Sequence, residues 1–168
     1  MELVIFRHGP AEPRGGDKPD ADRALTADGR RKTLLAAQGL ARVVDRPGVI
    51  LSSPNKRAHQ TACLLSEVFD LPVEVEASLA HDEVRPIEAM LRRRDEAALA
   101  IVGHEPTLSR LVGKMLGIPP RDGELQLKKA GALVLHAPRH PHDVPGPARL
   151  EMLLQPRALR MLAGENNA

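Results

Sequence analysis

Residues 3–9 read LVIFRHG, so four apolar side chains in a row end at Arg7, His8 and Gly9. A short apolar run bounded by polar residues is typical of a strand that is buried on both faces. Two later runs have the same form: residues 49–51 lead into SSP, and residues 98–102 lead into GHEP. We therefore expect three buried strands, each followed directly by polar residues.

Segments with helical signals separate these strands. Thr26 is placed to cap a helix over residues 27–44, and Ser53 followed by Pro54 predicts a helix that starts there and runs to about residue 69. The other expected elements are strands at residues 73–76, 132–136 and 149–154, and helices at residues 86–93, after residue 104 to 116, and at residues 157–162. This alternation predicts an α/β fold, with a mainly parallel central sheet and helices on both faces, in a single domain over residues 1–168.

Length and composition limit the classes of function. The chain has 168 residues, and 24 Lys and Arg against 22 Asp and Glu leave a net charge of +2, which is too small to indicate a nucleic-acid partner. Tyr and Trp are absent, and Phe6 and Phe69 are the only aromatic residues, which disfavours the ring stacking that single-stranded nucleic acids need. The single Cys63 falls on the expected apolar face of a helix and is interpreted as a small buried side chain.

The sequence also disfavours a membrane location. No apolar run approaches the roughly 20 residues that a membrane span needs. The N-terminus carries Glu2 and only a short apolar run, unlike a signal peptide, so a cytoplasmic location is expected.

The polar residues after the strands suggest one site. In parallel sheets, ligands bind at the carboxyl ends of the strands, so Arg7, His8, Arg57 and His104 should meet at one edge. Guanidinium groups match phosphate oxygens, and helix starts nearby add free N–H groups. An imidazole kept neutral by surrounding cations is a competent nucleophile. These residue types in this arrangement favour a phosphoryl group as the ligand.

Several short motifs occur in an order that resembles a known family. They are RHG at residues 7–9, RALT at 23–26 with Gly29, SSP at 52–54 with Arg57, QT at 60–61, VGHEP at 102–106 and the strand that begins at Gly131-Ala132. Together they resemble the histidine phosphatase superfamily, which has the phosphoglycerate mutase-like fold. Within it, the chain is similar to the short SixA-type branch of phosphohistidine phosphatases. The resemblance spans nearly the whole chain.

The resemblance implies roles for four residues of the expected site. His8 would be the nucleophile that becomes phosphorylated, while Arg7, Arg57 and His104 would bind the phosphoryl group and stabilise its transition state. Because these three residues supply positive charge, no metal or other cofactor is implied.

Two further residues match the family pattern. Arg23 corresponds to an arginine near the pocket of SixA-like members, and its alternative is a surface ion pair with Asp20 or Asp22. Glu105 would contribute its backbone N–H rather than its side chain.

The chain departs from the family pattern in two places. His59 stands where many relatives have Glu, and we interpret it as a residue on a solvated helix face rather than at the pocket mouth. The usual general acid is not evident, and Asp82 and Glu83 are its candidates. A phosphohistidine leaves as an imidazole, whose conjugate acid titrates near 6.5, and so needs less acid help than an alkoxide. The expected substrate is therefore a phosphorylated protein of the histidine phosphotransfer type, with a small phosphorylated substrate as the alternative.

Other functions remain open. His136, His140 and His142 form a local cluster that could bind zinc, although a solvated loop is favoured. A cysteine phosphatase would need Arg six residues after Cys63, where the chain has Phe69. A non-catalytic module that binds phosphorylated partners is the alternative from a different class, although such a module would need only the arginines.

Overall fold

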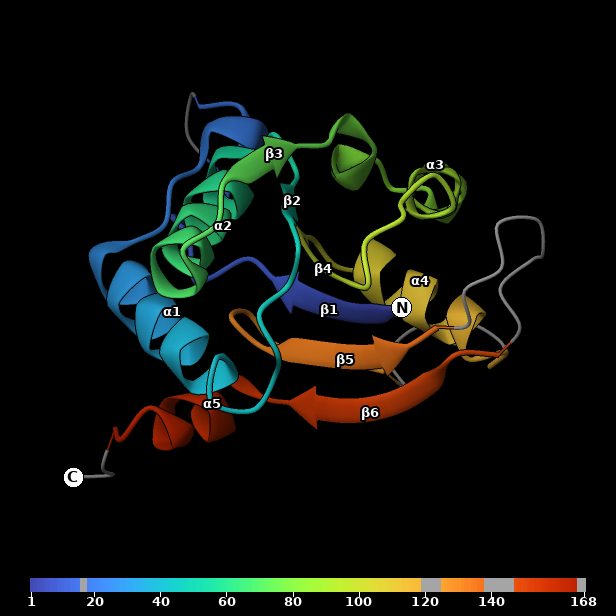
Figure 1. Cartoon of the computed structure of the whole chain (residues 1–168). Coiled ribbons are helices and arrows are strands. Elements are labelled where there is room, and N and C mark those ends of the chain that lie inside the picture. The colour runs from blue at the N-terminus through green and yellow to red at the C-terminus, as the bar shows by residue number, and fades with distance from the viewer. Residues whose placement is uncertain (16–17, 119–124, 138–146, 166–168) are drawn as a thin grey trace.

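The computed structural model describes residues 1–15, 18–118, 125–137 and 147–165. Six strands form one sheet in the order β3-β2-β4-β1-β5-β6 (Figure 1). The strands are β1 (Glu2–Arg7), β2 (Ile50–Ser52), β3 (Val73–Val75), β4 (Ala98–Gly103), β5 (Ala132–His136) and β6 (Arg149–Leu154). The helices are α1 (Ala27–Leu40), α2 (Lys56–Phe69), α3 (Val84–Leu91), α4 (Thr107–Met115) and α5 (Pro156–Leu162), with short 3-10 turns η1 (Asp20–Asp22) and η2 (Ala77–Ala80).

Most of the sheet is parallel, as the alternation of strands and helices predicted. Strands β3, β2, β4 and β1 are parallel neighbours, with Phe6 opposite Val102 and Arg7 opposite Gly103. At one side, β5 runs antiparallel to β1, and β6 runs antiparallel to β5. The N-terminal strand β1 therefore lies inside the sheet, where both of its edges are paired.

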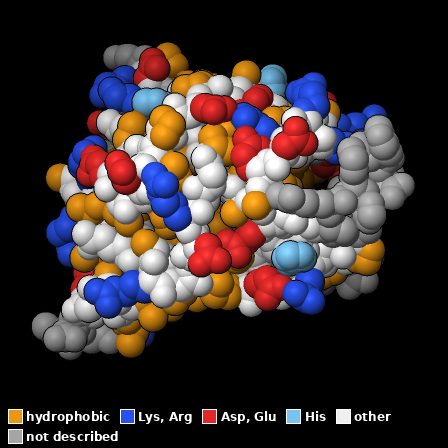
Figure 2. All heavy atoms as spheres, viewed as in Figure 1, with side chains coloured by type: hydrophobic (Ala, Val, Ile, Leu, Met, Phe, Trp, Pro, Cys, Tyr) orange, Lys and Arg blue, Asp and Glu red, His pale blue; other side chains and the backbone are white. Residues whose placement is uncertain are grey.

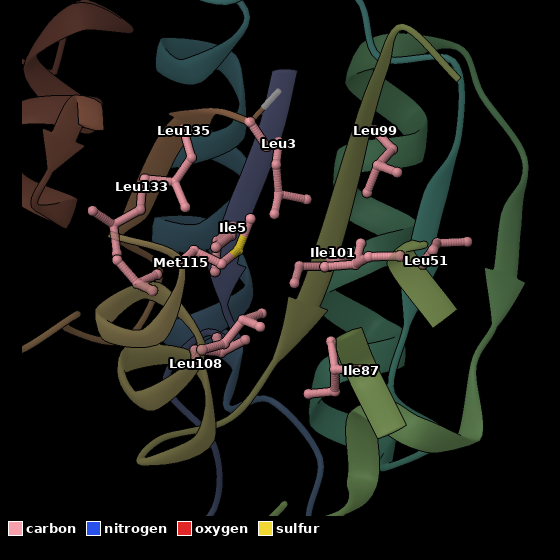
Figure 3. Close-up of a cluster of buried hydrophobic side chains, with 14 of the residues drawn as sticks. Leu3, Ile5, Leu51, Ile87, Leu99, Ile101, Leu108, Met115, Leu133 and Leu135 are labelled. Atoms are coloured by element: carbon pink, nitrogen blue, oxygen red, sulfur yellow. The ribbon is translucent and has the colours of Figure 1, made fainter. Parts of the chain in front are cut away.

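Helices cover both faces of the sheet, which explains the unbroken apolar run in β1. Leu3 and Ile5 pack with α3 and α4 on one face, in the cluster that Figure 3 shows. Val4 and Phe6 point to the other face and pack with α1, α2 and α5. Each of these four side chains is at most 1% exposed, and burying one contributes about 1.5–3 kcal/mol.

Some helix boundaries differ from those expected. Helix α1 ends at Leu40 rather than residue 44, because the chain tightens into hydrogen bonds over three residues, from Val43 N–H to the Leu40 carbonyl. Helix α3 begins at Val84, so Pro86 lies in its first turn, where its missing N–H has no intrahelical partner to lose. Cys63 is only half-buried, so its interpretation as a buried core residue was wrong.

The surface carries charges of both signs. On the face shown in Figure 2, Lys and Arg side chains are interspersed with Asp and Glu side chains. Within the described ranges, no helix has the length and apolar character needed to cross a membrane.

Candidate active site

The carboxyl ends of β1, β4 and β2 lie side by side, and hydrogen bonds continue past them. The backbone N–H of His8 donates to the Gly103 carbonyl at 3.1 Å, and that of Ser53 donates to the Val102 carbonyl at 3.0 Å. These bonds bring His8, Ser53 and His104 together, although they are far apart in the sequence. The rings of His8 and His104 lie 5.0 Å apart between centroids, at an interplanar angle of 50°.

The loop after β1 holds His8 in place. A Cβ atom at Gly9 would lie 2.0 Å from Oγ1 of Thr33, so only glycine fits this close approach to α1. The backbone N–H of Gly9 donates to Oγ1 of Thr61 at 3.0 Å, and that hydroxyl donates to the Arg57 carbonyl at 2.8 Å. Thr61 therefore ties the loop that carries His8 to the first turn of α2, which carries Arg57.

The His8 ring has one nitrogen engaged and one directed at the cluster. Nδ1 lies 2.8 Å from the Gly9 carbonyl oxygen, which can only accept, so Nδ1 carries the proton and donates. Nε2 therefore holds the lone pair, and Nε of Arg57 donates to it at 3.4 Å. Burial lowers the pKa of His8 to about 3, opposed by the Gly9 hydrogen bond and assisted by the charges of His104, Arg57 and Arg7. At neutral pH, His8 is an uncharged base.

His104 is also neutral. Nε2 lies 3.2 Å from Nδ2 of Asn55 and 2.9 Å from Oγ of Ser53. Because the amide nitrogen of Asn55 can only donate, Nε2 is an acceptor and the proton of the neutral ring is on Nδ1. Nδ1 is buried and has no hydrogen-bond partner in the described part of the chain. Burial and then the charge of Arg57 lower the pKa of His104 to about 4, and the charge of Asp20 opposes this shift.

The contact with His104 also explains an error in the expected start of α2. Ser53 and Pro54 were expected to begin this helix, but it begins at Lys56 after Asn55. The Ser53 hydroxyl faces His104 and only weakly accepts from Asn55 N–H at 3.3 Å, so it does not cap the helix. Ser53, which has the sequence features of a helix cap, instead contacts a segment that is distant in the sequence.

Arg57 is 4% exposed and lies between His8 and the loop before α1. Its Nη1 donates to the Asp20 carbonyl at 2.6 Å, and its Nη2 donates to Oδ2 of Asp20 at 2.9 Å. Burial lowers the pKa of Arg57, but the Asp20 carboxylate opposes that shift. The guanidinium therefore stays charged, with its Nε edge toward His8.

Arg7 approaches the cluster from the end of β1. Its Nη1 donates to the Leu127 carbonyl at 2.7 Å. Its Nε is buried and has no partner among the described residues, so a donor is left for a ligand. Burial lowers the pKa of Arg7, and the nearby Glu105 carboxylate opposes the shift.

Arg23 is buried and lies beside the same cluster. It was expected either near the pocket or in an ion pair with Asp20 or Asp22. Its Nη1 donates to Oδ1 of Asp20 at 2.7 Å, which is the ion pair named as the alternative. Asp20 also binds Arg57, so this ion pair connects Arg23 to the site rather than to an open surface. Glu105 precedes α4, and its side chain accepts from the hydroxyl and the N–H of Ser109 in that helix.

The remaining sequence candidates lie outside this cluster. Asp82 and Glu83 are exposed residues ahead of α3, and no described contact joins either of them to His8. His59 is half-buried on α2, where its Nδ1 lies 3.7 Å from Sγ of Cys63. Of the three histidines of the possible zinc cluster, His136 is exposed, and His140 and His142 lie outside the described residues. Among the residues that the structure describes, no group of three His, Cys, Asp or Glu side chains could hold a metal.

Three contributors were not predicted from the sequence. Asn55 supplies the donor to His104, and Asp20 bridges two site arginines. Lys129 stands in the turn beside the site: the next residue, Ala130, donates its N–H to the carbonyls of Arg7 and His8. The pKa of Lys129 is lowered by burial first and then by the charges of four arginines, the first of which is Arg7. Only Asn55 lies next to a local signal, Ser53 followed by Pro54, and that signal was interpreted as a helix start.

The arrangement can bind an anion and attack it. Arg7 and Arg57 supply fixed positive charge, while the Nδ1–H of His104 is a donor without a described partner. The lone pair on His8 Nε2 faces the Nε–H of Arg57. A tetrahedral dianion such as a phosphoryl group would meet donors and a nucleophile together.

Comparisons with known proteins agree with this chemistry. A model of the histidine phosphatase superfamily (branch 1) matches residues 3–90. The chain is 34% identical over 142 residues to an uncharacterized protein of Picosynechococcus, covering 82% of this chain and 86% of that protein. It is 28% identical over 131 residues to the phosphohistidine phosphatase SixA homolog of Haemophilus influenzae, covering 70% of this chain and 78% of the homolog.

Solved structures share the fold. The protein histidine phosphatase SixA complexed with tungstate has a TM-score of 0.78 at 23% identity, covering 95% of this chain and 99% of that one. A mycobacterial glucosyl-3-phosphoglycerate phosphatase has a TM-score of 0.72 at 19% identity, covering 92% and 98%. The same fold thus carries phosphatases named for different substrates. With the family model matching more than half of its length, the chain belongs to the histidine phosphatase superfamily.

Proposed function

We propose that this protein is a phosphatase that hydrolyses phosphohistidine on a partner protein through a phospho-His8 intermediate. The observation that carries the proposal is the state of His8: its Nδ1–H is bound by the Gly9 carbonyl, and its neutral Nε2 faces Arg57. A nucleophile needs a free electron pair at the working pH, and the low pKa of His8 supplies it.

The first proposed step transfers the phosphoryl group to the enzyme. The substrate ring carries a proton from solvent on its other nitrogen. Nε2 of His8 attacks phosphorus, the P–N bond to the substrate breaks, and the electron pair leaves on the substrate ring, which departs as a neutral imidazole. The His8 ring gains positive charge as the new bond forms, and the Gly9 carbonyl stabilises that charge through Nδ1–H. Arg7, Arg57 and His104 bind the phosphoryl oxygens, which is the main task of a protein in phosphoryl transfer.

The second proposed step regenerates the enzyme. Water attacks phosphorus, the bond to Nε2 breaks, and inorganic phosphate leaves, while the proton from water passes to solvent. We propose that Glu105 adds its backbone N–H to the oxyanion contacts and that Arg23 lies at the substrate side. We also propose that the reaction needs no metal, so that excess chelator leaves the rate unchanged.

The acid–base character of the site supports a P–N rather than a P–O substrate. An alkoxide leaving group needs a proton donor, and Asp20 is the carboxyl bound directly to the site arginines. The hydrogen bond from Arg23 lowers the pKa of Asp20 to about 2, so this group is ionised and cannot act as an acid. Asp82 and Glu83 are exposed and have no described contact with His8. An imidazole leaving group tolerates this lack of a donor.

A substrate panel tests the proposal. The purified protein is given a phosphorylated histidine phosphotransfer domain and, separately, sugar phosphates, and kcat/KM is measured for each. We expect the phosphohistidine protein to be the better substrate. Faster turnover of the sugar esters would instead indicate a small-molecule phosphatase.

Trapping the intermediate tests the mechanism. After incubation with labelled substrate and an alkaline quench, which preserves phosphohistidine, the wild type should retain label, whereas His8→Gln should not. His81→Gln changes an exposed histidine in the same way and should label like the wild type. Binding of the phosphoprotein without release of phosphate in a single turnover would indicate a binding module.

A further inference from the structure

Asp20, in the turn η1, is surrounded by three arginines. Its Oδ1 accepts from Arg23 Nη1 at 2.7 Å and from Arg14 Nε at 3.2 Å, and its Oδ2 accepts from Arg57 Nη2 at 2.9 Å. Its main-chain carbonyl accepts from Arg57 Nη1 at 2.6 Å. The Asp20 side chain is 47% exposed, while those of Arg57 and Arg23 are 5% and 11% exposed, so Asp20 separates the buried arginines from solvent.

The contacts of Asp20 leave Arg57 with a defined orientation. A guanidinium is planar, and holding one edge of it sets the direction of the other edge. Asp20 holds both terminal nitrogens, so the Nε edge of Arg57 points at His8 Nε2, 3.4 Å away. A phosphoryl group on its way to Nε2 would meet this Nε–H edge first.

We propose that Asp20 is a positioning residue that holds the outer edge of Arg57 and so aims its Nε–H at the phosphoryl group that His8 attacks. This inference rests on the proposed phosphoryl transfer to His8. Asp20 itself does not touch the reacting atoms; it acts through Arg57.

Charge gives a second reason for an aspartate at this position. The charges of Arg23 and Arg14 both oppose the charged form of Arg57, so the three guanidiniums repel one another. The ionised Asp20 carboxylate lies between them and offsets that repulsion. Asparagine keeps the shape and one acceptor oxygen but not the charge, so Asp20→Asn should let Arg57 turn away from His8.

A competing role would have the opposite kinetic signature. If the carboxylate instead occupied the place of the phosphoryl group, its neutralisation would speed turnover and tighten the binding of inorganic phosphate. A positioning role requires kcat to fall while KM stays near the wild-type value, because ground-state attraction of the anion is retained. Loss of the local fold would raise KM and lower the melting temperature together.

The test compares Asp20→Asn with Asp22→Asn, a matched change at an exposed residue of the same turn. With the best substrate of the panel, kcat of Asp20→Asn should fall about tenfold to hundredfold, since small misplacements at a reacting centre have effects of that order. KM, phosphate inhibition and the melting temperature should stay near those of Asp22→Asn. Equal kcat values for the two variants, or faster turnover with tighter phosphate inhibition, would overturn the proposal.

A measurement without turnover separates this proposal from the proposed function. Hydrogen exchange of the Arg57 Nε–H, followed by NMR, should be slow in the wild type and in Asp22→Asn, and faster in Asp20→Asn. Unchanged exchange in Asp20→Asn refutes the positioning role even if no substrate in the panel is hydrolysed. Absence of turnover by the wild type, with the exchange difference present, refutes the proposed function and leaves the Asp20–Arg57 coupling intact.

Discussion

Replacing His8 by glutamine should reduce the acid sensitivity of the fold. The unfolded chain binds a proton on this ring below the ordinary pKa of 6.5, whereas the folded ring stays neutral until about pH 3. The contribution of neutral His8 to the free energy of unfolding is therefore complete above pH 6.5 and is lost progressively as the pH falls toward 3. Glutamine does not titrate, so His8→Gln removes this loss.

The structure sets the size of the effect. pH 4.5 lies two units below 6.5, and each unit corresponds to about 1.36 kcal/mol, so His8 alone should account for about 3 kcal/mol of the wild-type loss between pH 7.5 and pH 4.5. His104, whose pKa is lowered to about 4, should account for a similar loss over this range. Carboxylates that titrate in the same range contribute to the wild type and the variant alike and cancel in the comparison.

The assay is urea unfolding at pH 7.5 and pH 4.5 for the wild type, His8→Gln and His81→Gln. The fall in unfolding free energy between the two pH values should be smaller by about 3 kcal/mol in His8→Gln than in the wild type. His81→Gln, at an exposed side chain, should follow the wild type. Parallel pH profiles for the wild type and His8→Gln would mean that His8 titrates in the folded state near 6.5, as it does in the unfolded chain, and the inference that burial lowers its pKa would fail.

Three further changes have distinct expected outcomes. Arg57→Lys keeps the charge but loses the Nε–H that faces His8, so kcat should fall about a hundredfold in steady-state assays; a fall below threefold would contradict the role of Arg57. Thr61→Val leaves the buried Gly9 N–H without its acceptor and should cost about 1–3 kcal/mol in chemical denaturation, whereas an unchanged midpoint would show that the hydroxyl is dispensable. Lys129→Ala removes a cation beside the site and should raise KM for phosphorylated substrates more at low salt than at high salt; a KM independent of salt in both proteins would show that Lys129 does not attract the substrate.

Much of the fold follows from local patterns. The run of four apolar residues in β1 predicts a strand buried on both faces, and the structure packs Leu3 and Ile5 on one face and Val4 and Phe6 on the other. Alternation of strands and helices predicts the parallel part of the sheet. The antiparallel direction of β5 was not predictable in this way, because β-strand patterning reports burial and not the direction of the neighbour.

The site was predictable only where its residues follow strands or begin helices. His8, Arg57 and His104 could be placed at one edge because parallel strands end together. Asp20 occurs in a polar loop, where an acidic residue has no period or cap to mark it, and its contacts depend on how that loop folds back over α2. Ser53 before Pro54 is a strong local signal for a helix N-cap, but its hydroxyl contacts His104, some fifty positions later in the chain, and does not cap the helix.

The pairing of β1 with β4 has a consequence for how the protein is made. His8 is synthesised about ninety positions before the strand beside β1, which begins at residue 98 and ends next to His104. Until then, the imidazole remains in water, without the burial that lowers its pKa. An incomplete chain therefore lacks the assembled site. Recovery of hydrolysis after dilution from denaturant should follow the pairing of β1 with β4 rather than the formation of any single helix.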